Sequence, residues 1–245
     1  MTHVPTLPEL VGLVLLDGIA EPRDPVRQIG AAERIAGELN ALGESLVGFF
    51  VELARAEGCS WADIGAPRGL SRQGAQQRYA PLIAQLSVDD LVRTGVLRPF
   101  DAPALSCLRH AQTRAGRLGH DAVDSGDLLI ALLDDPAGLA GTVMRALDAD
   151  PAEVRAALAS EVDDDRPATT AGLAPPAIGP DVRRVIDGAV AEAGGHGVTV
   201  AHLFLGLLRI PGSCAGRVLT ERGVTRPAVL AQVLRLAGRP AGDSS

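Results

Sequence analysis

AQTRAGRLGHDAVDSGDLLIALL, residues 111–133, is the stretch that decides the fold, because a looser copy, AVAEAGGHGVTVAHLFLGLL, follows at residues 189–208. Each copy has an Ala-rich helical run, a Gly-His pair, a short polar turn and a Leu-rich helix. A second match comes after each copy, GLAGTVMRALDADPAEVRAAL in the first and SCAGRVLTERGVTRPAVLAQVL in the second. Such duplication predicts two similar helical units of about 60 residues each. We therefore expect an all-α fold.

The doubled pattern resembles the N-terminal domain of the Clp unfoldases, the Clp repeat domain. The resemblance rests on Gly119-His120, on Gly195-His196, on HLFLGLL at residues 202–208 and on Asp150-Pro151. It implies tandem four-helix repeats that form a pseudo-two-fold domain over residues 99–240. We place the repeats at 99–162 and 178–238, with a mobile linker at 163–177. In this family the domain receives substrates, adaptors or small-molecule ligands and does not hydrolyse ATP.

The amino-acid composition argues against several classes of function. All 23 basic residues are Arg, so the Lys that a P-loop needs to reach nucleotide phosphates does not exist here. No nucleophile–base motif is present, and we predict a protein that is not an enzyme and needs no cofactor. The net charge of −7 argues against non-specific adhesion to nucleic acid. The three Cys residues are too far apart for a disulfide framework, and no signal peptide or membrane span precedes them, so a cytoplasmic location is expected.

Residues 1–98 read as a separate helical domain. A short helix is expected over residues 7–16 and a second from Asp24-Pro25 through Leu39, where Asp caps and Pro occupies the first turn. A third helix is predicted over residues 44–56, ended by Gly58. Before the first repeat, Ser87 caps a linking helix that Gly95 ends.

Residues 59–79, CSWADIGAPRGLSRQGAQQRY, have the order of a helix-turn-helix. Ser60 caps a short helix, Pro67 and Gly69 break it, and Ser71 caps the next. The segment resembles the helix-turn-helix of bacterial regulators and of the promoter-reading sigma region. One departure is Pro67-Arg68, which is expected to shorten the first helix.

The second helix carries side chains suited to base reading. Gln amides pair with adenine and Arg guanidinium groups pair with guanine. We predict DNA contacts from six residues: Ser71, Arg72, Gln73, Gln76, Gln77 and Arg78. One module makes few contacts, so a homodimer on two half-sites is expected. The alternative is a helical hairpin that only packs or dimerises, and Trp61 and Tyr79 are assigned to the core.

The resemblance also suggests where ligands bind. Phe100 and Ile178 occupy the starts of the first helix in each repeat, next to the family's inter-repeat ligand surface, and we predict that they line an apolar groove. The alternative is that both are core residues. In ClpC-type members a Glu at the start of the Leu-rich helix helps to dock phosphorylated arginine. Gly126 and Ala201 stand at those positions here, so no phosphoarginine dependence is expected.

No metal site is predicted. Cys107 and His110 share a helical face, but no further ligands converge on them, and His120 and His196 lack partners at metal-binding spacing.

Taken together, the sequence predicts a non-enzymatic regulator that binds peptide or small-molecule ligands of Clp unfoldases, and DNA, including its own promoter. The Clp unfoldase itself is a further candidate partner. The alternative is an adaptor or ligand-sequestering decoy for a Clp protease that does not bind DNA.

Overall fold

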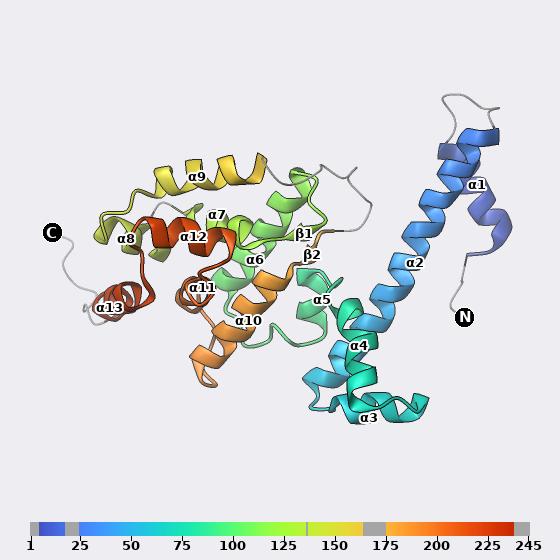
Figure 1. Cartoon of the computed structure of the whole chain (residues 1–245), viewed down its shortest axis with the longest axis horizontal. Helices are drawn as coiled ribbons and strands as arrows, with labels where there is room; N and C mark the ends of the chain where they lie inside the picture. The colour runs from blue at the N-terminus through green and yellow to red at the C-terminus, as the bar shows by residue number, and fades with distance from the viewer. Residues whose placement is uncertain (1–4, 18–24, 136, 164–174, 238–245) are drawn as a thin grey trace.

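The computed structural model describes residues 5–17, 25–135, 137–163 and 175–237 and shows an all-α protein (Figure 1). The N-terminal elements are α1 (Leu7–Asp17), α2 (Pro25–Ala56), α3 (Trp61–Gly65), the 3-10 helix η1 (Ala66–Arg68), α4 (Arg72–Ile83) and α5 (Val88–Arg93). α1 packs on α2, and α2 also packs on α4. The α1–α2 pair extends away from the remainder of the molecule (Figure 1).

The structure of α2 contradicts the prediction of two separate helices in this part of the chain. Two helices, separated near residues 40–43, were expected, whereas one continuous helix spans all 32 residues from Pro25 to Ala56. Gly43 lies inside it, in open space, so the glycine weakens the helix without breaking it. The predicted cap Asp24 lies outside the described residues.

The first repeat contains α6 (Ala102–Arg117), β1 (Ala122–Val123), α7 (Ser125–Leu133), α8 (Leu139–Ala146) and α9 (Pro151–Asp163). The second contains β2 (Ala177–Ile178), α10 (Pro180–Ala193), α11 (Val200–Leu207), α12 (Cys214–Glu221) and α13 (Arg226–Ala237). Four helices in each unit agree with the duplication in the sequence.

Reciprocal backbone pairing relates the two repeats by a pseudo-two-fold axis. The segment before α10 pairs with the one before α7, because the parallel strands β1 and β2 join Val123 to Ile178. In the same way, the segment before α6 pairs with the one before α11 through a parallel bridge from Phe100 to Val198. Helix packing follows this symmetry: α7 and α9 contact α12, while α11 and α13 contact α8. Pairs of one or two residues carry no periodic pattern, so the sequence did not reveal them.

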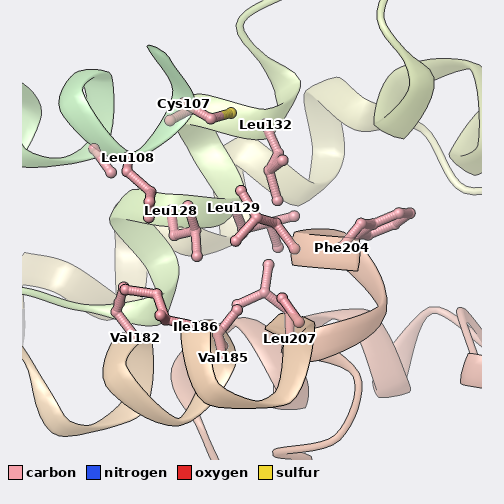
Figure 2. Packing of buried hydrophobic residues seen from close by; sticks show 14 of the residues in the cluster. Cys107, Leu108, Leu128, Leu129, Leu132, Val182, Val185, Ile186, Phe204 and Leu207 are labelled. Atoms are coloured by element: carbon pink, nitrogen blue, oxygen red, sulfur yellow. The ribbon is translucent and has the colours of Figure 1, made fainter. Parts of the chain in front are cut away.

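The core runs without interruption from one repeat to the other. Leu128, Leu129 and Leu132 of α7 face side chains of α10 and α11, among them Val185 and Leu207 (Figure 2). Helices pack within each repeat, as α6 does on α7, and also across to the opposite repeat, as α12 does on α7 and α9. Because part of the apolar surface of each repeat is covered only by the other, we expect neither repeat to be stable alone.

The predicted linker lies largely outside the described residues, which resume at residue 175. At its C-terminal end Ala177 belongs to β2, and its N–H donates to the Asp121 carbonyl at 3.0 Å. Ile178 also donates to the Leu86 carbonyl at 2.9 Å, which fastens the second repeat to the loop before α5.

Candidate functional site

The segment in which a helix-turn-helix is predicted forms the short helices α3 and η1 and then the longer helix α4, and its role as a DNA-binding motif stays a prediction. Ser60 caps α3 in a capping box with Asp63, whose side chain accepts the Ser60 N–H at 2.8 Å. Pro67 lies in η1, so α3 is indeed short, and Gly69 has a φ of 66° that glycine adopts without strain. Ser71 caps α4 by accepting the Gly74 N–H at 3.1 Å. The order of helix, tight turn and capped second helix is therefore present.

α4 separates a buried face from an exposed one. Ala75 and Tyr79 are buried, and the guanidinium of Arg78 lies 5.8 Å from the Tyr79 ring centre. Trp61 of α3 is half-buried and packs against the core. All six predicted DNA-contacting residues are exposed: Ser71, Arg72, Gln73, Gln76, Gln77 and Arg78. Their exposure leaves them accessible to a partner, and DNA binding stays a prediction.

A cavity of 510 Å³ lies where α2, α3 and α4 meet the start of α10. Gln76, predicted to contact DNA, and Ile178, predicted to contact a ligand, both line it. Its other walls are formed by Glu52, Arg55, Ala56, Trp61, Ala80, Ile83, Ala84, Val96, Pro180, Arg183 and Asp187. The cavity thus brings together two residues that were assigned to separate functions.

The polar wall of the cavity is an ion-pair cluster between α2 and α10. Arg183 binds Glu52, whose side chain is almost fully buried, and its Nε lies 3.9 Å from Asp187 Oδ1. Burial raises the pKa of Asp187, and the nearby Arg183 opposes that shift. One turn further along α2 from Glu52, the Arg55 guanidinium lies 4.4 Å from the Trp61 ring centre. Such a cleft suits a mainly apolar ligand that carries a few polar groups.

Sequence reasoning missed Glu52, Arg183 and Asp187. Glu52 and Arg183 are 131 positions apart in the chain, and each alone reads as an ordinary helical surface charge. Only the packing of α2 against the second repeat makes them partners.

The two residues predicted to line an inter-repeat groove are buried. Phe100 is 6% exposed and Ile178 is 3% exposed, and both belong to the continuous hydrophobic core. They therefore do not form the walls of an open groove between the repeats. Their pairing with Val198 and Val123 explains the burial, because each sits in a strand segment covered by the opposite repeat. Ile178 still reaches the cavity, and ligand binding at either residue stays a prediction.

The two positions that lack the family's Glu differ in the room they offer. A Cβ at the buried Gly126 would lie 3.2 Å from Cys214 Sγ and 3.2 Å from Asp124 Oδ1, so the start of α12 closes this position to a larger side chain. Ala201 is half-buried and has solvent beside it.

The histidines of the two Gly-His pairs serve the fold. The buried His120 lies with its Nδ1 3.5 Å from Asp127 Oδ2, and Arg114 Nε lies 3.3 Å from the other carboxylate oxygen. His196 Nδ1 is 3.2 Å from the Ala193 carbonyl.

Cys107 is buried, and burial raises the pKa of its thiol to about 12, which keeps it protonated and poor at binding metal. Within the described ranges no group of three or more His, Cys, Asp or Glu side chains is placed to hold a metal ion. None of the described helices is both long and apolar enough to cross a membrane.

Comparison with known proteins agrees with this tandem helical architecture. The sequence model of the Clp repeat N-terminal domain family matches residues 100–198. An uncharacterized protein of Mycobacterium tuberculosis (strain H37Rv) is 30% identical over 190 residues, which are 76% of this chain and 72% of that protein. An uncharacterized protein of Mycobacterium bovis matches to the same extent. The chain belongs to the family of these mycobacterial proteins, and it carries a Clp repeat domain.

More distant relatives are larger. The ClpA homolog of Brassica napus, a chloroplastic ATP-binding subunit of the ATP-dependent Clp protease, is 27% identical over 175 residues, which are 69% of this chain but 20% of that subunit. Among solved structures, the N-terminal domain of the chaperone ClpD from Arabidopsis thaliana matches 57% of this chain and 99% of that domain, with 22% identity and a TM-score of 0.43.

Proposed function

We propose that this protein is a non-enzymatic cytoplasmic regulator with two binding activities. Residues 99–240 bind peptides or small molecules that also bind Clp unfoldases, and α4 of the domain formed by residues 1–98 binds DNA, including the protein's own promoter. The observation that carries the proposal is the shared cavity, because Gln76 of α4 and Ile178 of the second repeat both line it.

The cavity supplies a physical route from ligand to DNA. A ligand seated against Ile178 and Pro180 would also touch α4, which carries five of the six predicted DNA-contacting residues and is capped by the sixth, Ser71. A ligand that binds one orientation of Gln76 more tightly than another shifts the protein toward that orientation and so changes its affinity for DNA. A difference of about 1.4 kcal/mol in the ligand's binding free energy between the two orientations can change the DNA affinity by at most tenfold. Binding would be reciprocal, so DNA would change the affinity for the ligand by the same factor.

Selection of random duplexes by the full-length protein tests the DNA half. We expect one sequence to be enriched, with Arg72→Ala and Gln76→Ala each costing about 1–3 kcal/mol and relaxing the preference at one base pair. Arg235→Ala is the matched control, because Arg235 is also exposed but belongs to α13, a helix at the other end of the molecule from α4 (Figure 1). Enrichment no greater than non-specific binding would contradict DNA recognition.

Calorimetry with peptides that bind the N-terminal domain of a Clp unfoldase tests the ligand half. The full-length protein should bind them with little dependence on salt, since no glutamate is available at positions 126 and 201 to require a phosphoguanidinium. Ile178→Val trims one methylene beside the cavity and should weaken binding several-fold, whereas Ile186→Val, in the same core but not on the cavity wall, should not. Equal affinity in both variants would remove Ile178 from the site.

The adaptor or decoy is a second candidate, favoured by the net charge of −7 and by the similarity to ATP-binding subunits of Clp proteases. It predicts the same ligand binding with no enriched DNA. A strict requirement for phosphoarginine would contradict the argument from Gly126 and Ala201, and it would not by itself decide between the two candidates.

A further inference from the structure

Large apolar side chains are exposed mainly in one part of the molecule. Within the described ranges, twelve of the fifteen exposed large apolar side chains lie on α1 and α2. They are Leu7, Val11, Leu13, Leu15 and Leu16 of α1 and Val26, Ile29, Leu39, Leu42, Leu46, Val47 and Phe50 of α2. We name these twelve residues the hairpin face. Contiguous exposed apolar surface of this kind marks an interaction site.

On α2 most of the hairpin face lies along one side of the helix, and it is densest between Leu39 and Phe50. Ile29, Leu39, Leu42, Leu46 and Phe50 recur at intervals that place them on one side of a helix. The charged residues over the same length fall at other positions of the helical wheel: Arg27, Glu33, Arg34, Glu38 and Glu44.

The molecule's own elements do not cover this stripe. α4 packs on the other side of α2, where Gly48, Val51 and Glu52 are buried. α1 contacts α2, yet α1 itself is apolar around its circumference and leaves Leu7 74% exposed and Leu16 62% exposed. A helix that is apolar all round is normally buried, so two adjacent helices both lack a covering partner.

A second copy of the chain is the partner that fits. The exposed apolar area of the hairpin face is on the order of 1,000 Å² per chain, which meets the ~800 Å² per partner of a stable interface. An uncharged stripe is self-complementary, as an interface about a two-fold axis requires. A lipid surface fits less well, because membrane-surface helices are rich in Lys or Arg on their polar face. The charged residues of α1 are Glu9 and Asp17, and on α2 Arg27 and Arg34 are accompanied by Glu33, Glu38 and Glu44.

We propose that the protein is a homodimer in which the α1–α2 hairpins of two chains associate into a four-helix bundle, with Leu42 and Leu46 near its centre. Helical hairpins with one apolar face pair in this way in bundles. The proposal does not rest on DNA or ligand binding, because the hairpin face is separate from both α4's exposed face and the cavity.

Light scattering after size-exclusion chromatography of the full-length protein, without DNA, tests the interface. A mass of about twice the 25.3 kDa of one chain is expected at micromolar concentration. The double variant Leu42→Glu with Leu46→Glu should weaken the dimer at least ~100-fold, because four carboxylates would be buried in the bundle. Leu234→Glu, at a 63% exposed position on α13, is the matched control and should leave the dimer intact.

Both substituted leucines are exposed in the single chain, so helix content by circular dichroism should not change. A monomeric wild type overturns the proposal, and so does a dimer that survives the double substitution. Sedimentation of monomers with anionic vesicles would assign the hairpin face to lipid and would also overturn it. Failure of DNA selection, by contrast, leaves this measurement unaffected.

Discussion

In the first repeat the Leu-rich helix begins with a buried carboxylate, whereas in the second repeat the equivalent helix begins with a histidine. Asp127 and His202 both occupy the third position of their helices, and both reach back to the residue that caps it. Asp127 accepts the Asp124 N–H at 3.2 Å, and His202 Nδ1 accepts the Thr199 N–H at 3.1 Å.

The surroundings of Asp127 and His202 differ more than their roles in capping do. Asp127 is fully buried and is surrounded by Arg114 and His120, so the first repeat contains a charged cluster in its interior. No ion pair accompanies His202 among the described residues, and its ring is half-buried. Duplication has therefore preserved the capping geometry, which the helix start requires, while the chemistry of the cap has diverged.

Removal of the carboxylate in Asp127→Ala should have the largest effect. It deletes half of the capping box, leaves Arg114 without its counter-charge and removes the polar partner of the buried His120 side chain. We expect a loss of about 3 kcal/mol in the free energy of unfolding, at the lower end for a broken buried pair because Arg114 retains some solvent contact. Urea unfolding followed by circular dichroism measures it. A loss below that of His202→Ala would show that the cluster does not stabilise the fold.

The segments before the first helices offer a second contrast. The Asp101 N–H donates to the Val198 carbonyl at 2.9 Å, and the Gly179 N–H donates to the Val123 carbonyl at 3.0 Å. A Cβ at Gly179, however, would lie 2.4 Å from that carbonyl oxygen. Gly179→Ala should therefore push β1 and β2 apart and cost about 2 kcal/mol by overpacking. Thermal unfolding tests this, and an unchanged midpoint would mean that the strand pair yields easily.

Loss of the histidine at the cap of α11 should cost less. His202→Ala removes one acceptor at a half-buried helix start, so a decrease of about 1 kcal/mol in unfolding free energy is expected. Asp101→Ala, which removes the acceptor of the Ala104 N–H at 2.8 Å, is the matched cap in the other repeat and should give a similar value. A much larger loss in His202→Ala would indicate that this ring has packing contacts beyond its cap.

The helix caps and the tandem helical plan could be predicted from the sequence, whereas contacts between distant segments could not. Caps at Ser60, Ser71 and Ser87 were predictable because a cap depends on a few neighbouring residues. The tandem four-helix plan was predictable because duplication is visible at long range. Contacts between distant segments were not, since nothing local marks Glu52 as the partner of Arg183.

The same limit applies to Phe100 and Ile178. Their place before the first helix of each repeat was correctly identified, but two-residue strands have no periodicity, so their burial by the opposite repeat was not foreseen. The prediction of two helices in place of α2 failed for a different reason. The glycine near the expected break costs only about 1 kcal/mol of helix stability, so the helix continues through it.

The smallest expected effect is a pH dependence that belongs to the first repeat alone. Burial raises the pKa of Asp127 above its ordinary 3.8, Asp124 adds to the rise, and His120 opposes it. An acid with a raised pKa binds its proton more tightly in the folded state than in the unfolded state. Its contribution to stability is therefore present below about pH 3.8 and is lost as the pH rises through the raised value.

Asp127→Asn removes this titration while keeping an oxygen that can accept the Asp124 N–H. The stability of the wild type minus that of Asp127→Asn should therefore decrease as the pH rises from about 4 to 7. Urea unfolding at a series of pH values measures the difference, and His202→Ala, which leaves Asp127 in place, should follow the wild-type profile over the acidic part of this range. An increase with pH would mean that attraction to Arg114 outweighs burial, so that the carboxylate pKa is lowered and the cluster in the first repeat acts as a net stabilising ion pair.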